Sequence, residues 1–203
     1  MNMKKIILTL ASLAIAVSSF AQVSVGLRAG GNYAGVRNVE KNQEFLTGIP
    51  GVYVGVAVQY SLDDVLLGFG IRGEVNYSMQ GYQFKFTQYD KEKTTLNYIN
   101  IPIMAEYSFF DGALSVMAGP QIGFNLGGTF KSVVEGGSVS AKNKHSLDAN
   151  TINTVDFGFA LGLTYMFIDN LGIDLRYNPG MTNIFVDGKV KNNVFSAGIL
   201  YKF

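Results

Sequence analysis

The sequence predicts an all-β fold: an eight-stranded antiparallel up-and-down transmembrane β-barrel. Apolar residues recur at every second position along eight segments, the spacing of one face of a strand. Short turns and long polar loops alternate between these segments, and aromatic residues gather at the segment ends. Gly supplies 24 of 203 residues and aromatic residues supply 13%, both high for a globular chain, and together these features favour a narrow barrel.

The N-terminus has the pattern of a secretory signal peptide. Lys4 and Lys5 precede an apolar run over residues 6–17, which is too short to span a membrane as a helix. The small residues Ser19 and Ala21 form a cleavage site. We therefore expect residues 1–21 to be removed on export and residues 22–203 to form one outer-membrane barrel domain.

Each of the first four expected strands ends its apolar row in a tyrosine, and each of the last four ends in an aromatic residue. In chain order the expected strands are residues 23–33, 52–60, 67–77, 99–107, 114–124, 155–167, 171–177 and 195–203. Pro102 and Pro120 lie inside two of them. Because proline has no N–H to donate, we expect a bulge or a local gap at each.

The connections differ in length at the two ends of the expected strands. Residues 61–64, 109–112 and 168–170 form short turns, whereas residues 34–50, 80–95 and 127–151 form long polar loops. Short turns on one side and long loops on the other are typical of outer-membrane barrels. This asymmetry predicts periplasmic termini and extracellular long loops.

The alternation leaves two interpretations, a soluble sandwich with its apolar face inward and a membrane barrel with its apolar face outward. Aromatic residues at both strand ends favour the barrel, since they form girdles around an aliphatic band. The opposite face combines glycine with charged groups, which suits a narrow lumen. The interior charge network expected there comprises Arg28, Arg72, Glu74, Glu106, Asp156, Asp174 and Arg176. We interpret it as a paired plug, and an ion-selective path is the alternative.

Three motifs resemble the PorT-like outer-membrane β-barrel family of Bacteroidetes-type bacteria. Residues 97–107 resemble its fourth strand, residues 118–123 its fifth, and residues 172–178 with 182–184 its seventh. The resemblance covers essentially the whole mature chain and implies architecture rather than chemistry. The family's named member is associated with a secretion and gliding apparatus, a role that a shared barrel does not transfer. The ending Tyr201 and Phe203 also resembles the signal that the barrel-assembly machinery recognises.

Chemically reactive residues are few. The chain has no Cys and one His, which excludes a thiol nucleophile, a disulfide framework and a His-based metal site. A net charge of +1 gives no basic field for nucleic acid. His145, Ser146 and Asp148 could suggest a nucleophile and base, but they lie together in the longest loop, and a solvated loop is the alternative that we favour. We expect no cofactor, no metal and no enzymatic activity.

The sequence therefore predicts a non-enzymatic outer-membrane protein with a structural role or a partner-binding role through its long loops. A narrow small-solute channel is the alternative, followed by a lipid-modifying enzyme. Tyr82, Phe84 and Phe86 alternate in the second long loop and indicate strands that continue beyond the membrane. This aromatic ribbon could bind a protein partner by edge pairing or cover itself as a hairpin. The other expected partners are outer-membrane lipid and, during insertion, the assembly machinery.

Overall fold

The computed structural model describes residues 22–38, 46–62, 66–85, 90–136, 139–147, 152–185 and 189–203. The expected signal peptide, residues 1–21, lies outside the described residues. The strands are β1 (Val23–Asn38), β2 (Leu46–Ser61), β3 (Phe69–Lys85), β4 (Asp90–Phe109), β5 (Leu114–Gly136), β6 (Val139–Leu147), β7 (Val155–Ile168), β8 (Leu171–Pro179) and β9 (Val190–Lys202).

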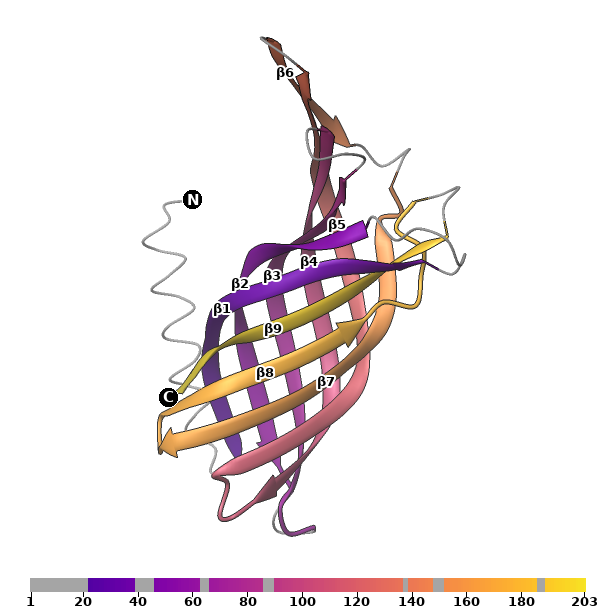
Figure 1. The fold of residues 1–203 in the computed structure, drawn as a ribbon. Coiled ribbons are helices and arrows are strands. Elements are labelled where there is room, and N and C mark those ends of the chain that lie inside the picture. Colours follow the sequence, from indigo (N-terminus) through magenta and orange to yellow (C-terminus); the bar gives the residue numbers. More distant parts are fainter. Residues whose placement is uncertain are drawn as a thin grey trace, which may run out of the picture.

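Within the described residues, eight of these strands close into an antiparallel barrel, as the sequence predicts (Figure 1). The hydrogen-bonded order runs β4-β3-β2-β1-β9-β8-β7-β5, and pairing of β4 with β5 closes the circle. Strand β6 pairs with the outer part of β5 and takes no place in the wall. Closure gives every wall strand a neighbour on both sides. A bilayer requires this because lipid tails cannot form hydrogen bonds with backbone N–H and C=O groups.

The two faces of the wall differ sharply in chemistry. The outward side chains are apolar, and Ile103 and Leu161 are 58% and 44% exposed. The inward side chains are polar, and Arg72 and Asp174 are 1% and 0% exposed. The prediction of an apolar exterior and a polar interior is therefore confirmed.

The short-turn end of the barrel carries tight connections. Phe110, Asp111 and Gly112 have positive φ angles of 52°, 52° and 88° and turn β4 into β5. The described chain also begins and ends here: the Gln22 carbonyl accepts a bond from the Ser61 N–H, and the Phe203 N–H donates to Val25. Both described ends thus lie on the side opposite the long loops (Figure 1).

Aromatic rings pack against each other at both ends of the wall. At the short-turn end, the Tyr107 ring lies 4.7 Å from Phe69 and 4.6 Å from Phe109, centroid to centroid. At the long-loop end, Tyr177 stacks on Phe195 at 4.5 Å. These rings flank the aliphatic outer band, as girdles at two membrane interfaces would.

The two strand prolines interrupt the ladder without shifting its register. Between β3 and β4 the pairing runs from Asn76–Asn100 to Gly73–Ile103 and omits the positions at Pro102. Between β4 and β5 it omits those at Pro120 in the same way, while the β5–β7 pairing includes Pro120. The expectation of a local gap at each proline is confirmed.

The three expected long loops are shorter than the sequence predicts. Of residues 34–50, β1 takes 34–38 and β2 takes 46–50; of residues 80–95, β3 takes 80–85 and β4 takes 90–95. Residues 127–151 were expected to form a loop, but β5 continues to Gly136 and β6 returns alongside it as a hairpin. Strands β3 and β4 also continue past the wall and pair up to Lys85 and Lys91. We call this part the projecting sheet; it comprises residues 81–85, 90–96, 128–136 and 139–147, and it rises above the barrel in Figure 1.

Candidate functional site

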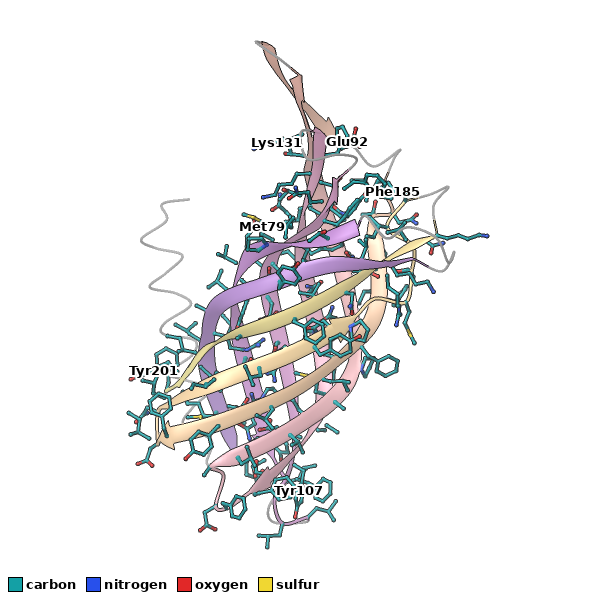
Figure 2. The ribbon with its side chains drawn as sticks, viewed as in Figure 1. Met79, Glu92, Tyr107, Lys131, Phe185 and Tyr201 are labelled. Carbon is teal, nitrogen blue, oxygen red and sulfur yellow. The ribbon has the colours of Figure 1, made fainter. Side chains whose placement is uncertain are left out.

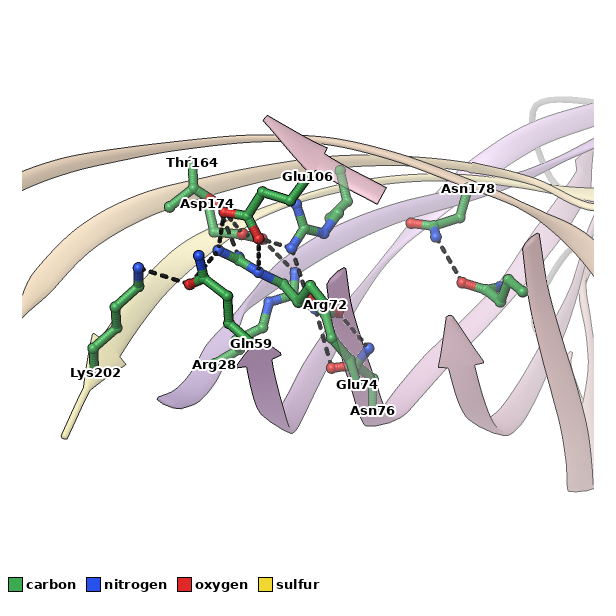
Figure 3. Close-up of polar contacts among 12 residues, drawn as sticks. Arg28, Gln59, Arg72, Glu74, Asn76, Glu106, Thr164, Asp174, Asn178 and Lys202 are labelled. Atoms are coloured by element: carbon green, nitrogen blue, oxygen red, sulfur yellow. Dashed lines mark hydrogen bonds and ion pairs between the residues drawn. The ribbon is translucent and has the colours of Figure 1, made fainter. Parts of the chain in front are cut away.

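Four charged side chains from three strands meet in the lumen (Figure 3). The Arg28 guanidinium of β1 donates to the carboxylates of Glu74 on β3 and Asp174 on β8. Arg176, two residues after Asp174, donates to Glu74 at 2.7 Å and forms an ion pair with Asp174 at 2.9 Å. Two cations and two anions therefore neutralise each other inside a wall that hides them from water and lipid.

A second ion pair lies toward the short-turn end. Arg72 holds Glu106 with two parallel bonds, from Nε at 2.8 Å and from Nη2 at 2.7 Å. This bidentate geometry is the strong form of a charge-assisted hydrogen bond. The Thr164 hydroxyl accepts from Arg72 at 3.3 Å and donates to Asp174 at 2.9 Å, which joins the pair to the first cluster.

Lys202 is an interior residue that the sequence analysis missed. Its ammonium donates to the Gln59 side chain at 3.0 Å, and Gln59 also accepts from Arg72 at 3.4 Å. The residue lies between Tyr201 and Phe203, so period two alone assigns it to the lumen face. Tyr201 and Phe203 on either side of it are exposed on the outward face.

Asp156 lies apart from the other six predicted network residues. Its carboxylate accepts from the Thr182 hydroxyl at 2.5 Å and from the Asn192 amide at 2.7 Å. Among the described residues it forms no ion pair. It therefore ties β7 to the chain around Thr182 and to β9 near the long-loop end, while the other six residues form the linked clusters.

An apolar cluster covers the lumen at the long-loop end. Leu96 and Tyr98 of β4 pack with Ile152 and Ile184, and all four side chains are buried. The backbone supports this arrangement, since Ile152 bridges to Phe185 and the Asn153 N–H donates to the Ile184 carbonyl at 2.9 Å. The sequence analysis missed this lumen cover because Ile152 and Ile184 lie outside its expected strands.

Two cavities show how little open space the lumen holds. At the short-turn end, a cavity of about 780 Å³ is lined by polar groups that include Gln59, Asp169 and Lys202. Beside the first charge cluster, a second cavity holds only about 30 Å³. The barrel is therefore hollow at one end and filled by its own side chains beyond it.

The projecting sheet joins the lumen cover through Leu96, which belongs to both, and through Phe185, which packs against the cover. Tyr82 of β3 lies edge-on to Phe185, with 6.5 Å between ring centroids. Burial raises the pKa of the Tyr82 phenol above its usual range, so the group stays protonated. Figure 2 labels Phe185 beside this end of the barrel and labels Glu92 and Lys131 on the projecting sheet.

The trio considered for nucleophilic catalysis lies in β6 and just after it. His145 and Ser146 are consecutive positions of β6, paired in register with Phe130 and Thr129, and their side chains lie outside the described part of the structure. Asp148 lies outside the described residues. Within the described ranges, no group of three or more His, Cys, Asp and Glu residues could hold a metal ion.

A family model described as "Outer membrane protein beta-barrel domain" matches residues 20–186. The chain belongs to this family. It is therefore an outer-membrane β-barrel protein, and the outward apolar band of the structure is its lipid-facing surface. No curated protein matches the chain. Among the described residues, no helix has the length and apolarity needed to cross a membrane.

Solved structures with a similar fold include two bacterial surface proteins. Neisserial surface protein A is 17% identical with a TM-score of 0.52, and the match covers 89% of this chain and 99% of that one. Ail, the attachment invasion locus protein of Yersinia pestis, is 13% identical with a TM-score of 0.52 in its complex with the heparin analogue sucrose octasulfate; the match covers 90% of this chain and 99% of that one. At these identities the likeness shows the fold alone.

Proposed function

We propose that this outer-membrane barrel is a non-enzymatic surface protein that presents the projecting sheet to a partner outside the cell. In this proposal the termini and short turns face the periplasm, and the long-loop end faces the exterior. Residues 1–21 serve as the cleaved signal peptide, and Tyr201 and Phe203 contact the assembly machinery. The PorT-like resemblance belongs to the same proposal, as a branch within the wider family.

The observation that carries the proposal is that side chains of the barrel itself fill the described lumen. The buried cluster around Arg28 and Glu74 fills the middle, and the apolar lumen cover closes the long-loop end. A barrel filled in this way has little room for transport, which argues against the narrow-channel alternative. The remaining surface with structure of its own is the projecting sheet.

The architecture of the projecting sheet supports a binding role. Within the described residues, β6 pairs on one side with β5 and leaves its other backbone edge open. An open edge is a template for an added strand, and the face of the sheet beside it offers a second docking surface. The Ail complex with a heparin analogue supports ligand binding as a role for barrels of this fold.

Single-cysteine variants test the orientation and the surface role together, because the native chain has no Cys. Thr129→Cys on the projecting sheet should react with a membrane-impermeant maleimide in intact cells, whereas Ser61→Cys at the short turn should react only after lysis. A photo-crosslinking residue at Thr129 should form adducts in intact cells, and the same residue at Ser61 should not form them from outside. Labelling of Ser61→Cys alone in intact cells would reverse the orientation, and the lack of any adduct at Thr129 would refute the surface role.

A further inference from the structure

Three lysines occupy one register row across the projecting sheet. Lys93 of β4 pairs with Lys131 of β5, and Lys131 pairs with Lys144 of β6. Directly paired residues share a face, and neighbouring strands are about 4.8 Å apart, so Lys93 and Lys131 lie side by side on one face. The adjacent row on the same face places Lys85 opposite Lys91, and its β6 position is Lys142.

The described acids do not balance this face. The projecting sheet contains three described acidic residues, and two of them, Asp90 and Glu92, occupy the alternate positions of β4 that belong to the other face. The third, Glu135, is a position of the lysine face, four residues after Lys131, and pairs with Ser140 near the hairpin tip; one acid there leaves the lysines in excess. Within the described part of the chain, neither Lys93 nor Lys131 forms an ion pair.

Such a row costs stability unless an anion binds it. Like charges directly opposite each other on neighbouring strands destabilise a sheet. Lysines on the edge strand alone would serve to keep other edges away, but Lys93 and Lys131 lie on inner strands of the projecting sheet. The row therefore has the chemistry of a binding surface for several negative charges at once.

The distance of the lysine row from the membrane surface indicates which kind of anion it can reach. The outer aromatic row contains Tyr77, Ile99 and Phe124 as register partners, and Lys93 lies six residues before Ile99 in β4, toward the long-loop end. At about 3.3 Å per residue and a strand tilt of about 45°, the lysine row lies roughly 14 Å beyond the aromatic row. The lipid headgroup layer extends only about 5–7 Å beyond the hydrocarbon, so the row stands above lipid phosphates.

We propose that the lysine face of the projecting sheet binds an anionic polysaccharide, which lies across β4 and β5 with its sulfate, phosphate or carboxylate groups on Lys93 and Lys131. A polymer with repeated charges matches a row that crosses strands. A protein strand added to the edge of β6 would meet backbone groups instead. This inference rests on the proposed function, because it requires the projecting sheet to face the exterior.

The test uses the full chain in nanodiscs of zwitterionic lipid, with dextran sulfate as the probe and uncharged dextran as the control polymer. Wild-type protein should bind dextran sulfate at low ionic strength, lose affinity as salt rises, and ignore dextran. Lys93→Gln with Lys131→Gln should weaken binding roughly three- to twentyfold, the sum of two exposed charge pairs. The matched control, Lys189→Gln with Lys191→Gln, removes the same charge near β9 and should bind as wild type does.

Each result decides the inference. Equal losses in the two double variants would show general attraction to charge and overturn the lysine row as a site. Lack of wild-type binding to dextran sulfate would overturn the polysaccharide, as would unchanged binding by Lys93→Gln with Lys131→Gln. If dextran sulfate fails to bind while the Thr129 crosslinker still captures an acidic protein in cells, the polysaccharide inference fails and the proposed function stands. Heat-shifted mobility in SDS verifies that each variant is folded.

Discussion

At the residue scale, a charged side chain that is fully buried in the lumen is stable only when it is paired with an opposite charge. Removing an ion from water costs several kcal/mol even after the protein relaxes, and a partner recovers this cost only with good geometry. Arg72 and Glu106 have that geometry, with two parallel bonds and side chains at 1% and 0% exposure. Removing one partner of the pair should therefore lower the free energy of unfolding more than replacing both partners with apolar side chains.

Glu106→Gln should destabilise the barrel by about 3–5 kcal/mol, because it leaves the Arg72 guanidinium buried without its counter-charge. The double change Arg72→Met with Glu106→Met should cost less than Glu106→Gln alone. Urea unfolding followed by far-ultraviolet circular dichroism measures both, since the chain has no Trp. Glu92→Gln on the projecting sheet is the control and should stay within about 0.5 kcal/mol of wild type. A cost for Glu106→Gln no larger than that of the control would refute the role of the pair.

At the element scale, period-two alternation predicted the wall strands and which face of each meets lipid, because the bilayer imposes one chemistry outside and the lumen another. It could not predict which charges pair. Arg28 meets Asp174 only because the closed register brings β1 and β8 together, and no short segment contains that information. Strand β6 was missed for another reason: outside the membrane, its polar sequence forms a hairpin through backbone pairing without an apolar row.

Neighbouring glycines on β1 should respond in opposite ways to a methyl group. At Gly30, a Cβ would meet the backbone of Ala197 and Gly198 on β9, whereas at Gly31 the nearest atom is the Gly51 carbonyl oxygen at 3.8 Å. Gly30→Ala should therefore cost about 1–3 kcal/mol through overpacking. Gly31→Ala should be neutral or slightly stabilising in the same unfolding assay. Equal costs at the two positions would contradict the close approach of β1 and β9.

The lipid-facing side of β7 can be checked at two adjacent positions. Leu161 is 44% exposed and Ala160 is 0% exposed, so consecutive residues face opposite environments. In detergent-free membranes, Leu161→Cys should react with a lipid-phase reagent and not with a water-soluble maleimide. Ala160→Cys is the matched control and should resist the lipid-phase reagent. The reverse labelling pattern would mean that the barrel wall is inside out.

At the scale of the whole molecule, the barrel is a closed cylinder with unequal ends. The short-turn end opens into a cavity of about 780 Å³, and a separate cavity beside the charge cluster holds about 30 Å³. The other end is covered by the apolar cluster of Leu96, Tyr98, Ile152 and Ile184, and the projecting sheet rises beyond it. An ion entering from the short-turn end meets two barriers in series, one made of paired charges and one made of hydrocarbon.

Two barriers in series predict the electrical behaviour of the purified protein. In planar bilayers the wild type should show no large, steady current. Ile184→Ser should loosen the lumen cover but leave the current low, because the side chains of Arg28, Glu74, Asp174 and Arg176 still fill the lumen below it. Heat-shifted mobility in SDS shows whether each reconstituted sample contains folded barrel, so that a lack of current from unfolded protein is not mistaken for a closed lumen. Reproducible open currents from folded wild-type protein would refute the closed lumen and restore the small-solute channel as the better function. Currents from Ile184→Ser alone would show instead that the apolar cover is the only effective barrier and that the buried charges line a conducting path.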